Sequence, residues 1–136
     1  MKMRMKNNGA VFLIVIFAIA LLTTITVGIL VMTTEELQLM QNQLYAANAM
    51  CTAEAGLNAA FAQIRSTRSW ATGFTNTSVN GGSGTYTVTV TGTLPDRTIT
   101  STGTSSQGYV ARIAADVTMG TVSPYKIKID KLRVNE

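Results

Sequence analysis

The chain has 136 residues, of which 46% are hydrophobic, and its 11 basic and 7 acidic side chains give a formal charge of +4. It contains no histidine and one cysteine, Cys51, which excludes an internal disulfide, a cysteine metal cluster and every catalytic arrangement that pairs a nucleophile with histidine. Three cations stand in the first six residues, so the remainder is close to neutral and indicates no polyanion partner; we expect neither an enzyme nor a cofactor.

Residues 10–32 form an uncharged, mostly aliphatic run directly after a basic leader, residues 1–9. At about 1.5 Å per residue, a helix of this length covers roughly 35 Å, enough to cross a hydrocarbon core of about 30 Å. The cations lie on its N-terminal side only, so we expect the N-terminus in the cytoplasm and the rest of the chain outside. The threonines of the run are expected to bond back to carbonyls one turn earlier (Thr23, Thr24, Thr26).

Other interpretations of this run are a cleavable signal peptide and a plain membrane anchor. The apolar region of a signal peptide is about 7 to 15 residues long and ends at small residues. The run here is longer and continues without a break into Thr33 and Thr34. We therefore favour a specialised helix over both alternatives.

Residues 33–66 contain no proline and one glycine, Gly56, and are rich in good helix formers, so the helix is expected to continue to near Ser66. Two apolar stripes recur there at helical spacing: an earlier stripe of Leu37, Met40, Leu44, Ala47 and Cys51, and a later stripe of Met50, Ala53, Leu57, Phe61 and Ile64. One hypothesis is that the earlier stripe meets other helices while the later one lies on this protein's own sheet. A single broad stripe on a curved helix would fit equally well.

From residue 67 to residue 84 the composition turns to Ser, Thr, Asn and Gly, which predicts a loop. Four strands are predicted after it, with a turn at residues 94–96: 85–91, a more polar strand at 97–102, 109–119 and about 125–134. All except the second alternate apolar and polar side chains. The short connections between them favour antiparallel pairing.

A sheet with one apolar face has to be covered, and the long amphipathic helix is the only element available for this. The predicted fold is therefore α+β: a long N-terminal helix packs by its outer half on a small antiparallel four-stranded sheet. The predicted organisation is a leader at 1–9, a transmembrane and assembly helix at 10–32, the outer half of the helix at 33–66, and a head of loop and sheet at 67–136.

The leader ending in Gly9, the uncharged helix starting at Ala10 and the helix leading into a small antiparallel sheet resemble a type IV prepilin or pseudopilin. Within the helix, residues 33–38 and especially 46–58, with the sequence Ala-Glu-Ala-Gly-Leu, are similar to the N-terminal region of the PilX-type minor pilins. The resemblance covers about residues 1–66, whereas the sheet matches only in general pattern.

The resemblance implies that a prepilin peptidase cleaves between Gly9 and Ala10 on the cytoplasmic face and methylates the new amine. The chain would lie in the bacterial inner membrane and then move, through an inner-membrane assembly platform, into a pilus or pseudopilus at the cell surface or in the periplasm. Its partners would be other pilins or minor pilins.

Two departures from the family pattern matter: Ala10 stands where the first mature residue is usually Phe, and Ile14 stands where major pilins carry a glutamate. In major pilins that carboxylate is understood to pair with the terminal amine of a neighbouring subunit, because an unpaired charge in an apolar filament core is costly. A chain with Ile14 is expected to be a minor component that acts in initiation, at the tip or in low copy.

The candidates for helix–helix assembly are seven apolar side chains: Phe12, Ile14, Phe17, Leu21, Leu37, Met40 and Leu44. Taken singly, each is better explained as a lipid-facing or core position. A set of six basic residues could instead form a DNA-binding patch, but three aspartates are interleaved with them, so we expect a solvated face and no nucleic-acid partner (Arg97, Arg112, Lys126, Lys128, Lys131 and Arg133, with Asp96, Asp116 and Asp130).

The alternative function is a membrane-anchored adhesin or ligand-binding module that never polymerises. Such a protein would keep its N-terminus at Met1, whereas a processed pilin would begin at Ala10.

Overall fold

The computed structural model describes residues 6–79, 81, 82 and 84–135. The chain divides into two units, Met1–Gln41 and Asn42–Glu136, which are described separately. In the first unit the described element is the beginning of a helix, α1, whose bounds are Lys6–Ser66. The predicted end at Ser66 is confirmed, while the start lies before Ala10, where the uncharged run begins. No proline interrupts this segment, which allows one continuous set of backbone hydrogen bonds.

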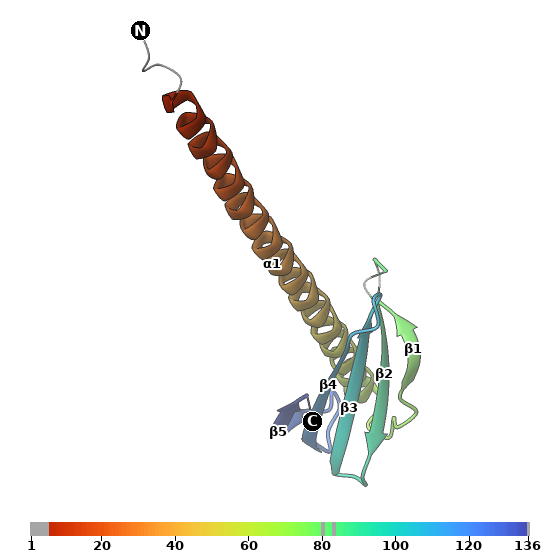
Figure 1. The fold of residues 1–136 in the computed structure, drawn as a ribbon. Coiled ribbons are helices and arrows are strands. Elements are labelled where there is room, and N and C mark those ends of the chain that lie inside the picture. The colour runs from red at the N-terminus through yellow and green to blue at the C-terminus, as the bar shows by residue number, and fades with distance from the viewer. Residues whose placement is uncertain (1–5, 80, 83, 136) are drawn as a thin grey trace. The chain divides into compact units, whose positions relative to one another are not determined.

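The second unit combines the rest of α1 with a five-stranded antiparallel sheet (Figure 1). The strands are β1 (Phe74–Ser78), β2 (Gly84–Thr91), β3 (Asp96–Ser105), β4 (Val110–Met119) and β5 (Ile127–Val134). They lie in the sheet in the order of the sequence, so each strand pairs with the one that follows it. The α+β class and the antiparallel pairing are confirmed, but the predicted number of four strands is wrong.

The additional strand is β1, which lies within the predicted loop of residues 67–84. Its composition, Phe-Thr-Asn-Thr-Ser, gives a weak strand signal, and its pairing with β2 is irregular between Phe74 and Thr77. Asn76 has φ of 44°, in the left-handed region that Asn tolerates better than most residues. The strand is held by Phe74, whose ring packs between those of Trp70 and Tyr86.

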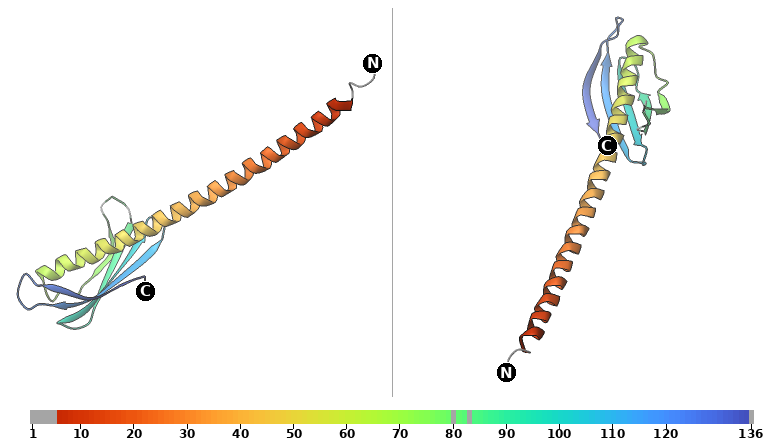
Figure 2. Two further views of the ribbon diagram at one scale, coloured as in Figure 1. Left: turned by 90° about the vertical axis from the view of Figure 1, so that its left-hand side faces the viewer. Right: turned by 90° about the horizontal axis from the view of Figure 1, so that it is seen from above.

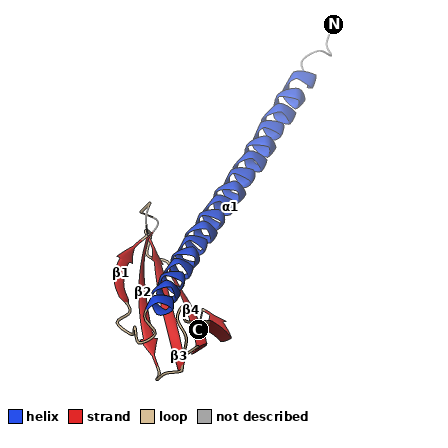
Figure 3. Cartoon of the chain, turned by 180° about the vertical axis from the view of Figure 1, so that it is seen from behind, coloured by secondary structure: helices blue, strands red, loops and turns tan. Residues whose placement is uncertain are grey.

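One face of the sheet is covered by the part of α1 that belongs to the second unit (Figures 2 and 3). The later stripe supplies this contact: Ala53, Leu57 and Ile64 are buried, and Met50 and Phe61 are half-buried against the core. The strands contribute Val88, Ile99, Ile113, Ala115, Val117 and Met119. The hypothesis that the later stripe lies on the protein's own sheet is therefore confirmed.

The helix approaches the sheet closely because small residues meet at the contact. A Cβ atom added to Gly103 of β3 would overlap the amide nitrogen of Ala53 and the carbonyl oxygen of Ala49. A Cβ atom at Gly56 would lie 2.8 Å from the ring of Tyr86 and would also overlap the Ser101 hydroxyl. Glycine and alanine at these positions thus set the distance between the helix and β3.

Strand β5 contains a bulge that keeps its apolar side chains on one face. Ile127 and Ile129 stand at odd positions, opposite Met119 and Val117, but the next apolar residues stand at even positions. The pairing shifts there, so that Asp130 is extra and Leu132 and Val134 return to the same face, opposite Ala115 and Ile113.

Candidate functional site

The first candidate surface is the exposed apolar part of α1 in the first unit. Its aliphatic and aromatic side chains from Val11 to Met32 are all exposed. Among the described residues, one helix is long and apolar enough to cross a membrane, and it is this one. This helix is thus long and apolar enough to be a candidate membrane span, and its side chains face no core of their own unit.

The hydroxyl groups in this segment do not oppose membrane insertion, because each is satisfied within the helix. Thr23, Thr24 and Thr26 donate to the carbonyl oxygens of Ile19, Ala20 and Leu22 at 2.6 to 2.8 Å. Thr33 and Thr34 make the same type of bond just beyond the uncharged run. The expected back-bonding of the first three threonines is confirmed, which leaves the segment with an apolar exterior.

The predicted assembly residues are exposed, but they do not form one face. Ile14, Phe17 and Leu21 lie within about 60° of one another around the helix axis at 100° per residue, whereas Phe12 points to the opposite side. Leu37, Met40 and Leu44 have the same spacing, form a second stripe of equal width and are also exposed. α1 is therefore apolar on all sides near its N-terminus, whereas further along its exposed apolar side chains form a stripe on one side.

The predicted processing residues lie inside α1. Gly9 and Ala10 are exposed and helical, and a Cβ atom added at Gly9 would meet nothing within 4 Å. Among the described residues, none crowds the Gly9 end of the bond between them. Because a peptidase binds an extended backbone, cleavage there requires the helix to unwind locally, which glycine favours more than any residue other than proline.

The charges on α1 are unbalanced. Between Gly9 and Ile64 the helix carries three carboxylates, Glu35, Glu36 and Glu54, and no lysine or arginine. Within the described part of the chain, no ion pair involves Glu35 or Glu36. Any positive partner of these two carboxylates has to come from outside the helix.

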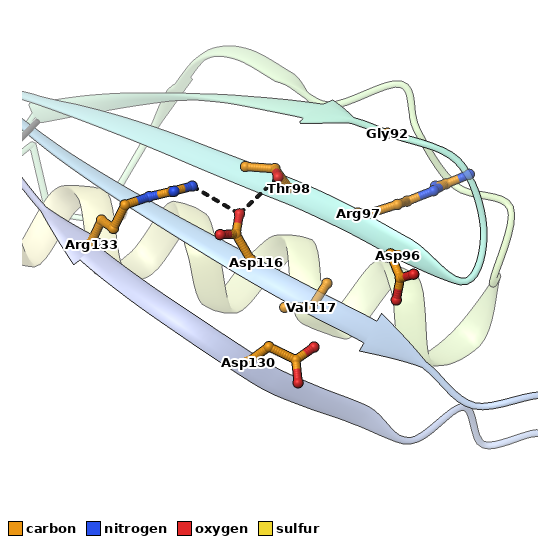
Figure 4. A pocket seen from close by; sticks show the side chains of 8 residues that line it. All are labelled: Gly92, Asp96, Arg97, Thr98, Asp116, Val117, Asp130 and Arg133. Carbon is orange, nitrogen blue, oxygen red and sulfur yellow. Dashed lines mark hydrogen bonds and ion pairs between the residues drawn. The ribbon is translucent and has the colours of Figure 1, made fainter.

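The second candidate is a hollow of about 400 Å³ in the second unit, at the turn between β2 and β3 and along β4 and β5 (Figure 4). It is lined by Gly92, Asp96, Arg97, Thr98, Asp116, Val117, Asp130 and Arg133. Figure 4 shows Thr98 and Arg133 directed at the carboxylate of Asp116. Thr98 Oγ1 and an Arg133 guanidinium nitrogen each donate to Asp116 Oδ1 at 2.8 Å. This carboxylate is already occupied by groups of the protein itself.

The other charged groups around the hollow are engaged as well. Thr118 Oγ1 lies 2.8 Å from Asp96 Oδ1 and 2.6 Å from Asp130 Oδ2, and Lys128 forms an ion pair with Asp130 at 2.6 Å. The hydrogen bond from Lys128, together with that from Thr118, lowers the pKa of Asp130, and the same contact raises the pKa of Lys128. These bonds connect β3, β4 and β5 on the face away from the helix, which is a structural role.

The residue types that most often serve in catalysis and metal binding are few in this chain. The chain has no histidine, and no group of three or more metal-ligating side chains occurs among the residues that can be described. The single cysteine, Cys51, is exposed on α1 beside the buried Thr52 and Ala53. Arg97, one of the basic residues considered for DNA binding, donates to the carbonyl oxygen of Trp70 at 2.6 Å and so fixes the loop after the helix.

Sequence reasoning missed the apolar face of β5. Ile129, Leu132 and Val134 remain 49%, 55% and 46% exposed, although they stand on the sheet face that the helix covers elsewhere. The signal was present in the sequence as a change from odd to even apolar positions at Asp130.

No family model, curated protein or solved structure matches this chain. Its function therefore has to be argued from its own residues.

Proposed function

We propose that this protein is a minor pilin or pseudopilin, a structural subunit that enters a type IV pilus or a type II secretion pseudopilus during initiation, at the tip or in low copy. The observation that carries the proposal is the exposed, uncharged helix of residues 10–32, which directly follows a basic leader ending in Gly9. A membrane anchor alone would need the apolar helix, but not the Gly–Ala junction at the end of the leader.

The proposed location follows from the same segment. The helix inserts into the bacterial inner membrane with its basic N-terminus in the cytoplasm, and the second unit of the chain lies outside the membrane. A prepilin peptidase removes residues 1–9 and methylates Ala10. The mature chain then passes through the inner-membrane assembly platform into the filament, where its partners are other pilins.

The action of such a subunit is physical. In the bilayer the exposed side chains from Val11 to Met32 are surrounded by lipid. When the helix leaves the bilayer, like helices have to cover this surface, because apolar area exposed to water costs about 25 cal/mol per Å². Ile14 supports a minor role, since it cannot offer a carboxylate to the terminal amine of a neighbouring subunit.

The test is the intact mass of the chain purified from membranes of a host with and without its prepilin peptidase. We expect the peptidase to produce a chain that begins at Ala10 and carries one added methyl group. Gly9→Val should abolish this change, whereas Gly28→Val, at a second exposed glycine of α1 with open space around it, should leave processing intact.

Sheared surface fibres provide the second measurement. The processed chain should be detectable in them, and the Gly9→Val variant should be absent. A chain that begins at Met1 in both hosts and never enters fibres would contradict the proposal and favour the membrane-anchored binding module.

A further inference from the structure

The two edge strands of the sheet, β1 and β5, differ sharply in charge (Figure 1). The β5 edge is rich in charged side chains: Lys126, Lys128, Asp130, Lys131 and Arg133. Residues 69–95, which include β1, contain no charged side chain. An edge strand exposes unpaired backbone groups that can pair with another chain, and charged side chains are a common protection against this. The β1 edge lacks the protection that β5 has.

The same edge strand contains a motif that the proposed function does not use. Asn76-Thr77-Ser78 matches the acceptor pattern for N-linked glycosylation, Asn-X-Ser/Thr with X other than proline. No other asparagine in the chain has serine or threonine two residues after it. Such a motif can be modified only where its asparagine is accessible and lies outside the cytoplasm. The structure tests the first condition, and the proposed orientation meets the second.

The reacting groups of the motif are accessible. Asn76 and Ser78 are both exposed. The Thr87 hydroxyl donates to Asn76 Oδ1 at 3.3 Å and accepts the backbone amide of Asn76 at 3.2 Å. Within the described part of the chain, no hydrogen bond involves Asn76 Nδ2. The contact with Thr87 therefore holds the oxygen side of the amide and leaves its nitrogen, the atom that would receive a sugar, open to solvent.

The backbone around Asn76 is only loosely tied to the sheet. Its φ of 44° departs from a regular strand, and the pairing with β2 shifts between Phe74 and Thr77. Among the described residues, no strand lies on the other side of β1. A short, irregular edge strand opens more easily than a central one, so the motif can enter the active site of a transferase. The open side of β1 leaves room for a large attached group.

We propose that Asn76 is a site of N-linked glycosylation and that its oligosaccharide protects the β1 edge. The donor is an oligosaccharide linked through a diphosphate to a membrane lipid, and the catalyst is a membrane transferase that acts outside the cytoplasm. Asn76 Nδ2 attacks the anomeric carbon of the first sugar, and a carbon–nitrogen bond forms. The bond from that carbon to the diphosphate oxygen breaks, the lipid diphosphate leaves with the electron pair, and the amide proton passes to a base of the transferase.

The protective effect is steric. Backbone pairing requires a second strand to approach within about 4.8 Å of β1, and a hydrated oligosaccharide on Asn76 occupies that space. It takes the place of the charged side chains that β5 carries. The inference goes beyond the proposed function and depends on it only for the orientation of the chain.

The test is the mass of the chain purified from membranes of its native host. Trypsin releases residues 69–97 as one peptide, which contains the motif. We expect this peptide to carry the added mass of a whole number of sugars, and its fragmentation should place them on Asn76. Asn76→Gln and Ser78→Ala should each abolish the added mass, whereas Ser78→Thr should keep it.

The matched control is Asn80→Gln, because Gly82 stands two residues after Asn80 and the acceptor pattern is absent there. This variant should keep the modification. Ser78→Ala leaves Asn76 in place, so a loss of mass in that variant does not come from a change of the residue with positive φ. An unmodified peptide from the native host, or added mass that persists in Asn76→Gln or Ser78→Ala, would overturn the site.

Light scattering by the purified chain in detergent tests the protective role. Asn76→Gln should aggregate severalfold faster than the glycosylated chain. Adding Thr75→Lys, which places a charge at an exposed position of β1, should restore slow aggregation. Thr121→Lys, at an exposed position between β4 and β5, should not. Equal rates for the glycosylated chain and Asn76→Gln, or equal rescue by the two lysines, would contradict protection of this edge.

The proposed function is tested separately, because leader cleavage removes residues 1–9 and glycosylation changes Asn76. A cleaved chain that enters fibres with an unmodified Asn76 would contradict the glycosylation site only. A glycosylated chain that still begins at Met1 and never enters fibres would contradict the filament role only.

Discussion

Gly103 of β3 lies so close to Ala53 of α1 that no side-chain carbon fits between them. The atoms that a Cβ would meet belong to the helix backbone, which cannot move aside as a flexible side chain would. Together with Gly56, this position allows the helix to come near the sheet and so supports the burial of Ala49, Ala53 and Ile99.

Gly103→Ala should therefore destabilise the protein by about 3 kcal/mol, because the helix and β3 have to separate to admit the methyl group. Gly120→Ala is the matched control, since its nearest neighbours would stand at 3.5 Å, an ordinary contact distance. Thermal unfolding of both variants in detergent, followed by circular dichroism, measures the difference. Equal melting temperatures for the two variants would show that the close approach is not stabilising.

Two buried serines of β3 should respond in opposite ways to replacement by alanine. The Ser101 hydroxyl is fully buried and has no hydrogen-bond partner among the described residues, so Ser101→Ala should leave stability unchanged or raise it by up to about 1 kcal/mol. Ser105 Oγ accepts the backbone amide of Tyr109 at 3.1 Å, and Ser105→Ala should cost about 1 to 2 kcal/mol. Chemical denaturation of the pair tests this difference, and a larger loss at Ser101 would contradict it.

Deletion of Asp130 should be about as mild as its substitution. Without the extra residue the strand alternates regularly, so Ile127, Ile129, Leu132 and Val134 stay on one face and the pairing with β4 is kept. Asp130→Ala keeps the bulge and removes only exposed polar contacts, so its effect should be small as well. Limited proteolysis of residues 120–135 compares the two, and a loss of protection in the deletion variant alone would show that the bulge itself stabilises the strand.

Cys51 provides a direct test of membrane orientation, because it is exposed and is the only cysteine in the chain. In cells without the assembly motor, a membrane-impermeant maleimide should label Cys51 from outside the inner membrane. Thr24→Cys in a Cys51→Ser background should resist the reagent, since this position lies inside the proposed span. Labelling of Cys51 only after lysis would reverse the proposed orientation.

Much of the fold could be predicted because it depends on strong local patterns. The unbroken helix to Ser66 follows from the absence of proline, and β2 and β4 follow from strict alternation. The more polar β3 is predicted too short, because Thr, Ser and Gly beyond Thr102 give a weak strand signal. β1 escaped prediction because its side chains are those of a loop, and its place depends on contacts of Phe74 with rings that the sequence does not bring together.

The candidate surfaces were only partly predictable, for a different reason. Burial of the later stripe follows from its period, but the exposure of Ile129, Leu132 and Val134 on β5 depends on where the helix lies across the sheet. The helix packs on buried residues of β2, β3 and β4, and the sequence does not show which strands these are. Arg97 donates to the carbonyl oxygen of Trp70, which is a backbone atom 27 residues earlier in the chain. Side-chain patterns in the sequence cannot predict a partner of this kind.

The order β1-β2-β3-β4-β5 has a consequence for biosynthesis, because every strand finds its partner next to it in the chain. In the proposed orientation the N-terminus stays in the cytoplasm, so the outer half of the helix, residues 33–66, leaves the membrane before any strand, and the strands then follow one hairpin at a time. Each hairpin closes only a short loop, so folding can keep pace with export. β5 is the last strand to arrive. It pairs with β4, which forms the edge of the sheet until then.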